Sequence, residues 1–147
     1  MISADLRGAH LAKAYLGESH LTGVKFDGAD LTGASLQVAD LNSASFVGAN
    51  LTEADLMGSM AMAADFTDAI MERCSLRGAH LAFANLSRAD LRNSDLLHAV
   101  LVGTTIEKAL LSGSVVHGIS AWDVKGEPAE QLNLTITPRP PPDVPKI

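Results

Sequence analysis

Apolar side chains recur at every fifth position of this chain from Leu6 to Val116. Of these 23 central positions, 16 are leucine and 3 are phenylalanine, and the residue two positions earlier is alanine in 16 repeats. Neither common element fits this period, because five steps turn a helix by about 140° and an odd step flips a strand residue to the opposite face. The pattern instead predicts short extended steps, each with a small and a large inward residue, separated by corners.

Glycine indicates how the corners are made, because it often lies two positions after the central residue. Glycine tolerates the positive φ that a type II turn requires. Four near-right-angle corners close a square of 20 residues, so the 23 repeats predict nearly six coils, a rod about 28 Å long at the usual strand spacing. The corner glycines are Gly8, Gly23, Gly28, Gly33, Gly48, Gly58, Gly78, Gly103, Gly113 and Gly118.

The repeat resembles the pentapeptide-repeat family, whose motif is Ala-(Asp/Asn)-Leu-x-x. Good local matches include Ala29-Asp30-Leu31, Ala54-Asp55-Leu56 and Ala89-Asp90-Leu91. The resemblance covers residues 4–118 and implies an all-β fold, a right-handed quadrilateral parallel β-helix, without implying one function. We expect the β-helix in residues 1–120 and a C-terminal cap strand with a proline-rich tail in residues 121–147. Residues 117–123 also resemble the closing segment of bacterial family members, so we expect a bacterial protein.

Charged residues provide a test of this register, because residues 20 apart should stack on adjacent coils. Opposite charges that face each other across neighbouring strands stabilise a sheet by roughly 0.2–1 kcal/mol a pair. The same rule predicts that Phe26, Phe46 and Phe66 stack along one inner line. The charged pairs at this offset are Asp5 with Lys25, Arg7 with Asp27, Glu53 with Arg73, Asp68 with Arg88, and Glu72 with Arg92.

Both ends of the predicted rod need covering. The repeat is in register from Ala4, so the first coil exposes backbone groups to which a partner, a second copy or a neighbouring segment can pair. A homodimer through an open end is one such arrangement. At the upper end, Trp122 and an alternating strand, Leu132–Ile136, are predicted to plug the shaft. The segment from Pro138 is predicted to be an extended linker.

Composition bounds the class of protein. Aromatic residues make up only 4% of the chain, since alanine and leucine fill the narrow interior. No apolar run approaches the ~20 residues of a membrane span, and no signal peptide precedes the repeats. A single cysteine, Cys74, occupies a small inward position, so we expect a buried alanine substitute. A reduced, cytoplasmic setting without membrane association is therefore expected.

Catalytic signals are weak throughout the sequence. The five histidines fall in different columns or lie several coils apart, too far to share a metal. The outward aspartates occupy the polar position of the motif itself, and the glycines are corners rather than a phosphate-binding loop. We therefore expect no enzyme activity, no cofactor and no metal.

One surface feature suggests a specific partner. Residues 26–72 contain eight acidic residues and no lysine or arginine. Such an acidic belt could imitate the phosphates of a DNA duplex, and some family members resemble DNA mimics that bind type II topoisomerases such as gyrase. That alternative needs no direct nucleic-acid binding by this chain. The belt residues without an oppositely charged partner in their column are Asp30, Asp40, Asp55 and Asp65.

Outward apolar residues favour a different function. Such patches usually mark contacts, so the preferred hypothesis is a non-enzymatic scaffold that binds a protein partner or a neighbouring domain. The C-terminal tail covering this face, and a purely structural spacer, remain alternatives. Ala61 is small for a central position, so Met60 or Met62 is expected to lean in and fill its place. The candidate binding residues are Met57, Met60, Met62, Phe83, Leu97, Val100 and Val102.

Overall fold

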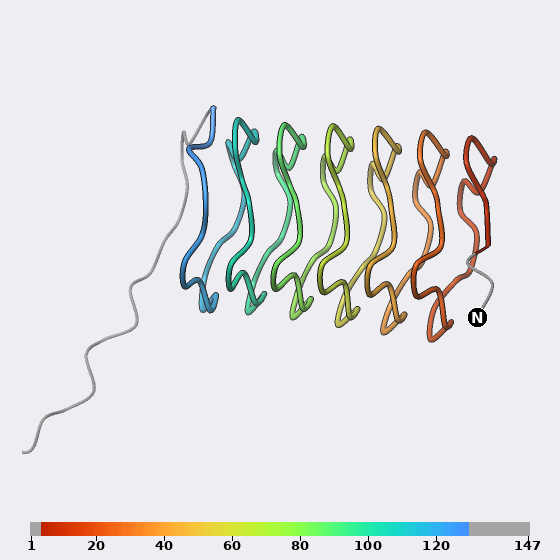
Figure 1. Cartoon of the computed structure of the whole chain (residues 1–147), viewed down its shortest axis with the longest axis horizontal. Coiled ribbons are helices and arrows are strands. Elements are labelled where there is room, and N and C mark those ends of the chain that lie inside the picture. The colour runs from red at the N-terminus through yellow and green to blue at the C-terminus, as the bar shows by residue number, and fades with distance from the viewer. Residues whose placement is uncertain (1–3, 130–147) are drawn as a thin grey trace, which may run out of the picture.

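The computed structural model describes residues 4–129, which form a right-handed quadrilateral β-helix with the predicted square coils. The coils stack along one axis (Figure 1). Each wall of a coil is one five-residue repeat. Walls pair through single parallel β-bridges rather than longer strands, from Asp5 with Lys25 to Thr105 with Lys125. Bridged residues are always 20 apart, which confirms the predicted register.

Backbone hydrogen bonds between coils hold each wall in place. Leu6 N donates to Lys25 O at 2.8 Å, and Lys25 N donates back to Ala4 O at 3.0 Å. At the corner, Gly8 N donates to Asp27 O at 2.9 Å. Because the same three bonds recur from coil to coil, backbone groups of the inner coils find partners without long strands.

The corners are tight turns with a positive φ at the second corner residue. Ala9 N donates to Leu6 O at 3.1 Å, and Gly8 between them has a φ of 64°, as a type II turn requires. Every equivalent position up to Asp123 has a positive φ, although 14 of these residues are not glycine. Glycine is therefore favoured but not required, since inter-coil bonds such as Lys13 N to Thr32 O (2.8 Å) hold the corner.

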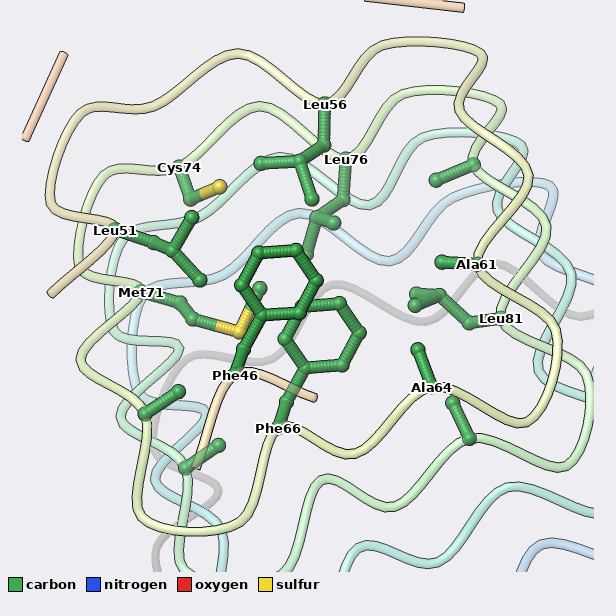
Figure 2. Packing of buried hydrophobic residues seen from close by; sticks show 14 of the residues in the cluster. Phe46, Leu51, Leu56, Ala61, Ala64, Phe66, Met71, Cys74, Leu76 and Leu81 are labelled. Carbon is green, nitrogen blue, oxygen red and sulfur yellow. The ribbon is translucent and has the colours of Figure 1, made fainter. Parts of the chain in front are cut away.

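A narrow apolar shaft runs through the coils. Central side chains are fully buried from Phe26 to Leu96, and the rings of Phe26, Phe46 and Phe66 stack with centroids 4.9 and 4.8 Å apart, as predicted. Figure 2 shows Phe46 and Phe66 in the middle of the shaft, between leucines of successive coils. Cys74 is buried at a small inward position of the shaft, as expected for an alanine substitute.

The predicted charge columns are present, although some of their members form hydrogen bonds within their own repeat. Arg88 donates from Nε and Nη2 to the Asp68 carboxylate at 2.6 and 2.7 Å, and Arg73 Nε donates to Glu53 at 3.1 Å. Arg7 interacts with the charge of Asp27 on the next coil, as expected, but its side-chain hydrogen bonds go to Asp5 of its own repeat at 2.8 and 2.6 Å.

A second group of charged residues follows the same local preference. Arg92 donates to Asp90 at 2.8 and 2.6 Å, and Glu72 accepts from Arg73 at 2.6 Å. Asp5 and Lys25 are joined by a backbone bridge. The column rule therefore places these residues correctly, while the choice of ionic partner is decided locally.

The upper end of the β-helix stops at a proline. The ladder runs to Lys125, one repeat beyond the predicted limit at residue 120. Pro128 occupies the column in which Arg88 and Lys108 have φ values of 57°. A proline ring holds φ near −65° and removes the N–H that would bond to the next coil, so the regular corner cannot form.

Trp122 does not plug the shaft, and that prediction is wrong. Its side chain is 68% exposed, because it occupies an outward position rather than an inward one. The predicted cap strand and the proline-rich tail lie outside the described residues. At the lower end, the first four central leucines, Leu6, Leu11, Leu16 and Leu21, are only partly buried.

Candidate functional site

One wall of the β-helix carries exposed apolar residues on its upper coils. Met60 and Val100 lie in one ladder, since Met60 bridges to His80 and His80 to Val100. Met62 and Val102 lie in the column two residues along, and Met60 and Met62 are 45% and 47% exposed. We call Met60, Met62, Phe83, Val100, Val102 and Trp122 the apolar face.

Phe83 is the most exposed of the predicted residues, at 61%. It occupies a corner with a φ of 60°, and its ring lies over Gly103 of the next coil. A Cβ atom at Gly103 would come within 2.6 Å of Phe83 Cδ1. The missing side chain therefore makes room for the ring to lie against the wall beside Val102.

Met57 and Leu97 lie at the corner that precedes the apolar face. Both occupy the column of Gln37 and Arg77, on the neighbouring wall. Met57 is 40% exposed and Leu97 is half-buried. The structure thus brings five of the seven predicted residues onto one wall and places these two at its edge.

Met60 and Met62 do not fill the space beside Ala61, so that expectation is wrong. Both side chains remain outside the shaft, while Ala61 is fully buried one coil before Leu81, which holds the same central position (Figure 2). Side chains on either side of a central residue point away from the core in an extended wall. The hydroxyl of Ser59, in the same repeat, is buried without a hydrogen-bond partner among the described residues.

Sequence reasoning missed Trp122 as a member of the apolar face. It lies in the column of Met62 and Val102, and its carbonyl accepts from Gly103 N at 2.7 Å. The signal that could have found it is the 20-residue column rule applied one repeat further. Trp122 lengthens the exposed apolar column to the last described coil.

The four candidate acidic residues do not share a wall. Asp30, Asp40, Asp55 and Asp65 occupy the polar motif position on four different walls, since each ladder joins only residues 20 apart. Each carboxylate also accepts a local hydrogen bond. Asp30 accepts from Thr32 Oγ1 at 2.6 Å, Asp40 from Thr22 Oγ1 at 2.8 Å, Asp55 from Gln37 Nε2, and Asp65 from Thr67 N at 3.0 Å.

Hydrogen bonding stabilises the charged form of two of these carboxylates. The Thr32 hydroxyl, and then the Thr32 N–H, lower the pKa of Asp30. The Thr22 hydroxyl, and then the Asn42 N–H, lower the pKa of Asp40. Hydrogen bonds to an ionised carboxylate favour that form, so these groups are suited to holding the wall together rather than to exchanging a proton at neutral pH.

Other reactive groups are either buried or dispersed. Burial raises the pKa of the Cys74 thiol well above its ordinary range, which keeps it protonated. Among residues 4–129, no group of three or more histidine, cysteine or acidic side chains is placed to hold a metal ion. His98 and His117 lie 6.4 Å apart between ring centroids. No helix in this part of the chain is long and apolar enough to cross a membrane.

Solved structures of similar proteins share this architecture. HetL, a pentapeptide repeat protein involved in heterocyst differentiation regulation from the cyanobacterium Nostoc sp. strain PCC 7120, is 28% identical with a TM-score of 0.53. The alignment covers 82% of this chain and 60% of HetL, so the chain spans about three-fifths of that protein.

Two further solved structures match this chain with lower TM-scores. Rfr23, a pentapeptide repeat protein from the cyanobacterium Cyanothece 51142, is 28% identical with a TM-score of 0.36, over 74% of this chain and 64% of Rfr23. QnrB1, a plasmid-mediated fluoroquinolone resistance protein, is 17% identical with a TM-score of 0.46, over 92% of this chain and 80% of QnrB1. Both TM-scores are below 0.5, so neither likeness bears on function.

Family membership follows from the repeats themselves. The family model, which describes eight copies of the pentapeptide repeat, matches three segments of the chain, residues 1–37, 39–78 and 74–113. No curated protein matches the chain. Proteins of this family are generally structural or interaction modules rather than enzymes. Because the family model covers well over half of the residues, this chain belongs to the pentapeptide-repeat family.

Proposed function

We propose that this protein is a non-enzymatic binding module that holds a protein partner, or a neighbouring protein domain, against the apolar face. One observation carries the proposal: the outward positions of this wall hold no Asp, Glu, Lys or Arg from Met60 to Trp122. Exposed methionine and aromatic side chains on a rigid wall are typical of the centre of a protein interface.

The size of the apolar face indicates what kind of contact it makes. Met62 and Trp122 are three coils apart, which is about 14 Å along the rod. A stable interface buries about 800 Å² on each partner, far more than one wall of this height provides. The apolar face therefore supplies the core of a larger contact, whose polar rim lies on the adjacent walls.

Two matched double variants test the proposal. Met62→Asp with Phe83→Asp places two charges in the apolar face. Asn42→Asp with Ser43→Asp places the same charges in the same two columns, one coil below Met62 and two coils below Phe83. Partner capture from cells of the source organism, identified by cross-linking and mass spectrometry, is expected to disappear only in the first variant. Equal capture by both variants, with unchanged melting temperatures, would contradict the proposal.

The acidic-belt alternative makes the opposite prediction. If the protein mimics DNA and binds a type II topoisomerase, then changing Asp30, Asp40 and Asp55 to lysine removes its effect in a gyrase supercoiling assay, and salt weakens that effect strongly. The Met62 and Phe83 variant leaves such an effect unchanged. Under our proposal, the lysine variant retains partner capture, because these aspartates lie on three walls and bond locally.

A further inference from the structure

The two edges of the apolar face differ in charge. The corner that precedes the face has two columns, and from Met57 upward neither column contains an acidic residue. The corner that follows the face carries Phe83 and, two coils later, Asp123. Among the corner residues of these coils, basic groups are thus found only before the face. We call the three residues on that side the basic edge: Arg77, His98 and His117.

The two histidines of the basic edge form a defined pair. His98 N donates to His117 O at 2.9 Å, and the ring centroids lie 6.4 Å apart at an interplanar angle of 65°. His98 has a φ of 59°, and a Cβ atom at Gly118 would come within 2.5 Å of its Nδ1. The bare glycine therefore makes room for the His98 ring against the corner, as Gly103 does for Phe83. Both histidines are exposed, so a bound partner can reach them.

Three ionisable groups lie around the histidine pair. Arg77, at the same corner, donates from Nη1 to Asp95 Oδ2 at 2.8 Å. Asp95, on the wall before the corner, also accepts from Leu97 N at 2.9 Å. His80 lies on the apolar wall itself. The carboxylate in the repeat of His98 is thus already engaged by Arg77 and the backbone, so a carboxylate brought by a partner would add to the site.

We propose that the partner of the apolar face is a polypeptide segment with acidic side chains next to its apolar ones, and that these carboxylates bind His98 and His117. This inference rests on the proposed function, whose surface it extends by one corner. A carboxylate accepts hydrogen bonds from imidazole N–H groups, and such bonds are stronger when the ring is protonated. Apolar side chains of the same segment then lie over Leu97 and Val100, which flank His98 in the sequence.

A carboxylate within an apolar segment suits the basic edge better than a polyanion or a metal ion. The chain has a net charge of −6, and residues 26–72 contain eight acidic residues without any lysine or arginine, so the rod repels a nucleic acid. A metal ion requires more protein ligands than this pair, and the described part of the chain supplies no third side chain to it.

Three short fluorescent peptides test the proposal directly. They share one order of leucine and polar positions, and the polar positions are all glutamate, all glutamine or all lysine. At pH 6, the glutamate peptide is expected to bind about fivefold more tightly than the glutamine peptide, which corresponds to a strong exposed ion pair. Raising the pH to 8 should remove most of this difference, because histidine loses its charge over this range. Fluorescence anisotropy measures the affinities.

Two matched double variants assign the effect to the basic edge. His98→Gln with His117→Gln is expected to reduce the glutamate preference at pH 6 to under about twofold. His10→Gln with His20→Gln makes the same replacements on the first coil and should keep the preference. The pH dependence of the wild type gives the same answer without any substitution. Equal binding of the three peptides, no binding by any of them, or a preference that survives in the first variant would overturn the proposal.

The variant with Met62→Asp and Phe83→Asp separates this inference from the proposed function. It is expected to bind the neutral glutamine peptide about fivefold more weakly, because the apolar contact is lost. Unchanged binding would contradict the apolar face and the inference together. Absence of the glutamate preference, with partner capture still dependent on Met62 and Phe83, would overturn only the carboxylate contact.

Discussion

The lower and upper coils of one wall differ on the outside and match on the inside. Leu21 and Leu41 face the shaft below, and Leu81 and Leu101 face it above. Outside, the lower coils carry polar residues at the positions that hold methionine, phenylalanine and valine above. This difference shows that the repeat restricts the residue types only at its inward and corner positions. The outward residues, and with them a binding surface, can therefore change without changing the fold.

The polar and apolar outer surfaces are organised by different interactions. In the lower coils, Asp40 accepts from Thr22 Oγ1 at 2.8 Å and from Asn42 N at 3.2 Å, while Asn42 Oδ1 accepts from Met62 N at 3.0 Å. Above them, Phe83 lies over Gly103. The polar groups of the lower surface form hydrogen bonds with one another, whereas the upper surface leaves apolar side chains exposed to solvent.

Removing an inward leucine should have the largest effect. Leu81→Ala is expected to lower the free energy of unfolding by about 2–5 kcal/mol, because its side chain is fully buried. Phe83→Ala, two residues away and 61% exposed, is expected to cost under about 1 kcal/mol. Chemical denaturation measures both values. Equal losses would show that the outer surface also supports the fold.

A methyl group under Phe83 should have the next largest effect. Gly103→Ala puts a Cβ atom 2.6 Å from Phe83 Cδ1 and leaves alanine at a φ of 67°. The left-handed conformation alone costs about 1–2 kcal/mol, and the ring must move off the wall. Thermal denaturation checks the loss. In the double variant with Phe83→Ala, the steric part should disappear and the backbone part should remain.

At a corner beside the apolar face, the opposite substitution, of a larger residue by glycine, can be tested. Val38 has a φ of 57° and is 58% exposed, and Gly58 holds the same corner one coil higher. Val38→Gly is expected to stabilise the protein by about 1 kcal/mol, since glycine adopts positive φ without steric cost. Gly58→Val should destabilise it by a similar amount. Melting temperatures that shift the other way would mean that the Val38 side chain packs more than its exposure indicates.

The smallest expected effect is a change in acid sensitivity on the lower coils. The hydrogen bond from Thr22 lowers the pKa of Asp40 from its ordinary value of 3.8. Its contribution to stability is therefore complete above pH 3.8 and is lost as the pH falls through the lowered value. Asp40→Asn is expected to flatten the decline in melting temperature below about pH 4. The control Met60→Asn, in the same column without a carboxylate, should leave that decline unchanged.

Much of the fold could be predicted because residues 20 apart in the sequence lie in the same column, so a residue's number gives its column. The Phe26, Phe46 and Phe66 stack and the pair of Asp68 with Arg88 follow from a step of 20 residues. Counting also placed Met62 and Val102 in one column. It could not choose between competing partners, so Arg7 with Asp5 was missed, because side-chain reach depends on rotamers that the repeat does not determine.

The candidate site shows the same division. The sequence named most of the apolar face but assigned Trp122 to a plug of the upper end, because the five-residue pattern ends at Val116. It also treated Asp30, Asp40, Asp55 and Asp65 as one belt, although the structure places them on four walls. Charge content is visible in a sequence, whereas the wall on which each charge lies requires the winding of the chain.

The amino-acid order alone determined a square shaft lined by alanine and leucine, because only a corner every five residues keeps those side chains inside. Tertiary structure alone decided where that shaft ends. Regular winding stops at Pro128, where a positive φ is impossible for a proline ring, and the chain leaves a cavity of about 310 Å³. It also decided which outer side chains remain exposed, since the stacking of closed coils puts Phe83 over Gly103 and leaves Met62 and Val102 on the outer surface of one wall.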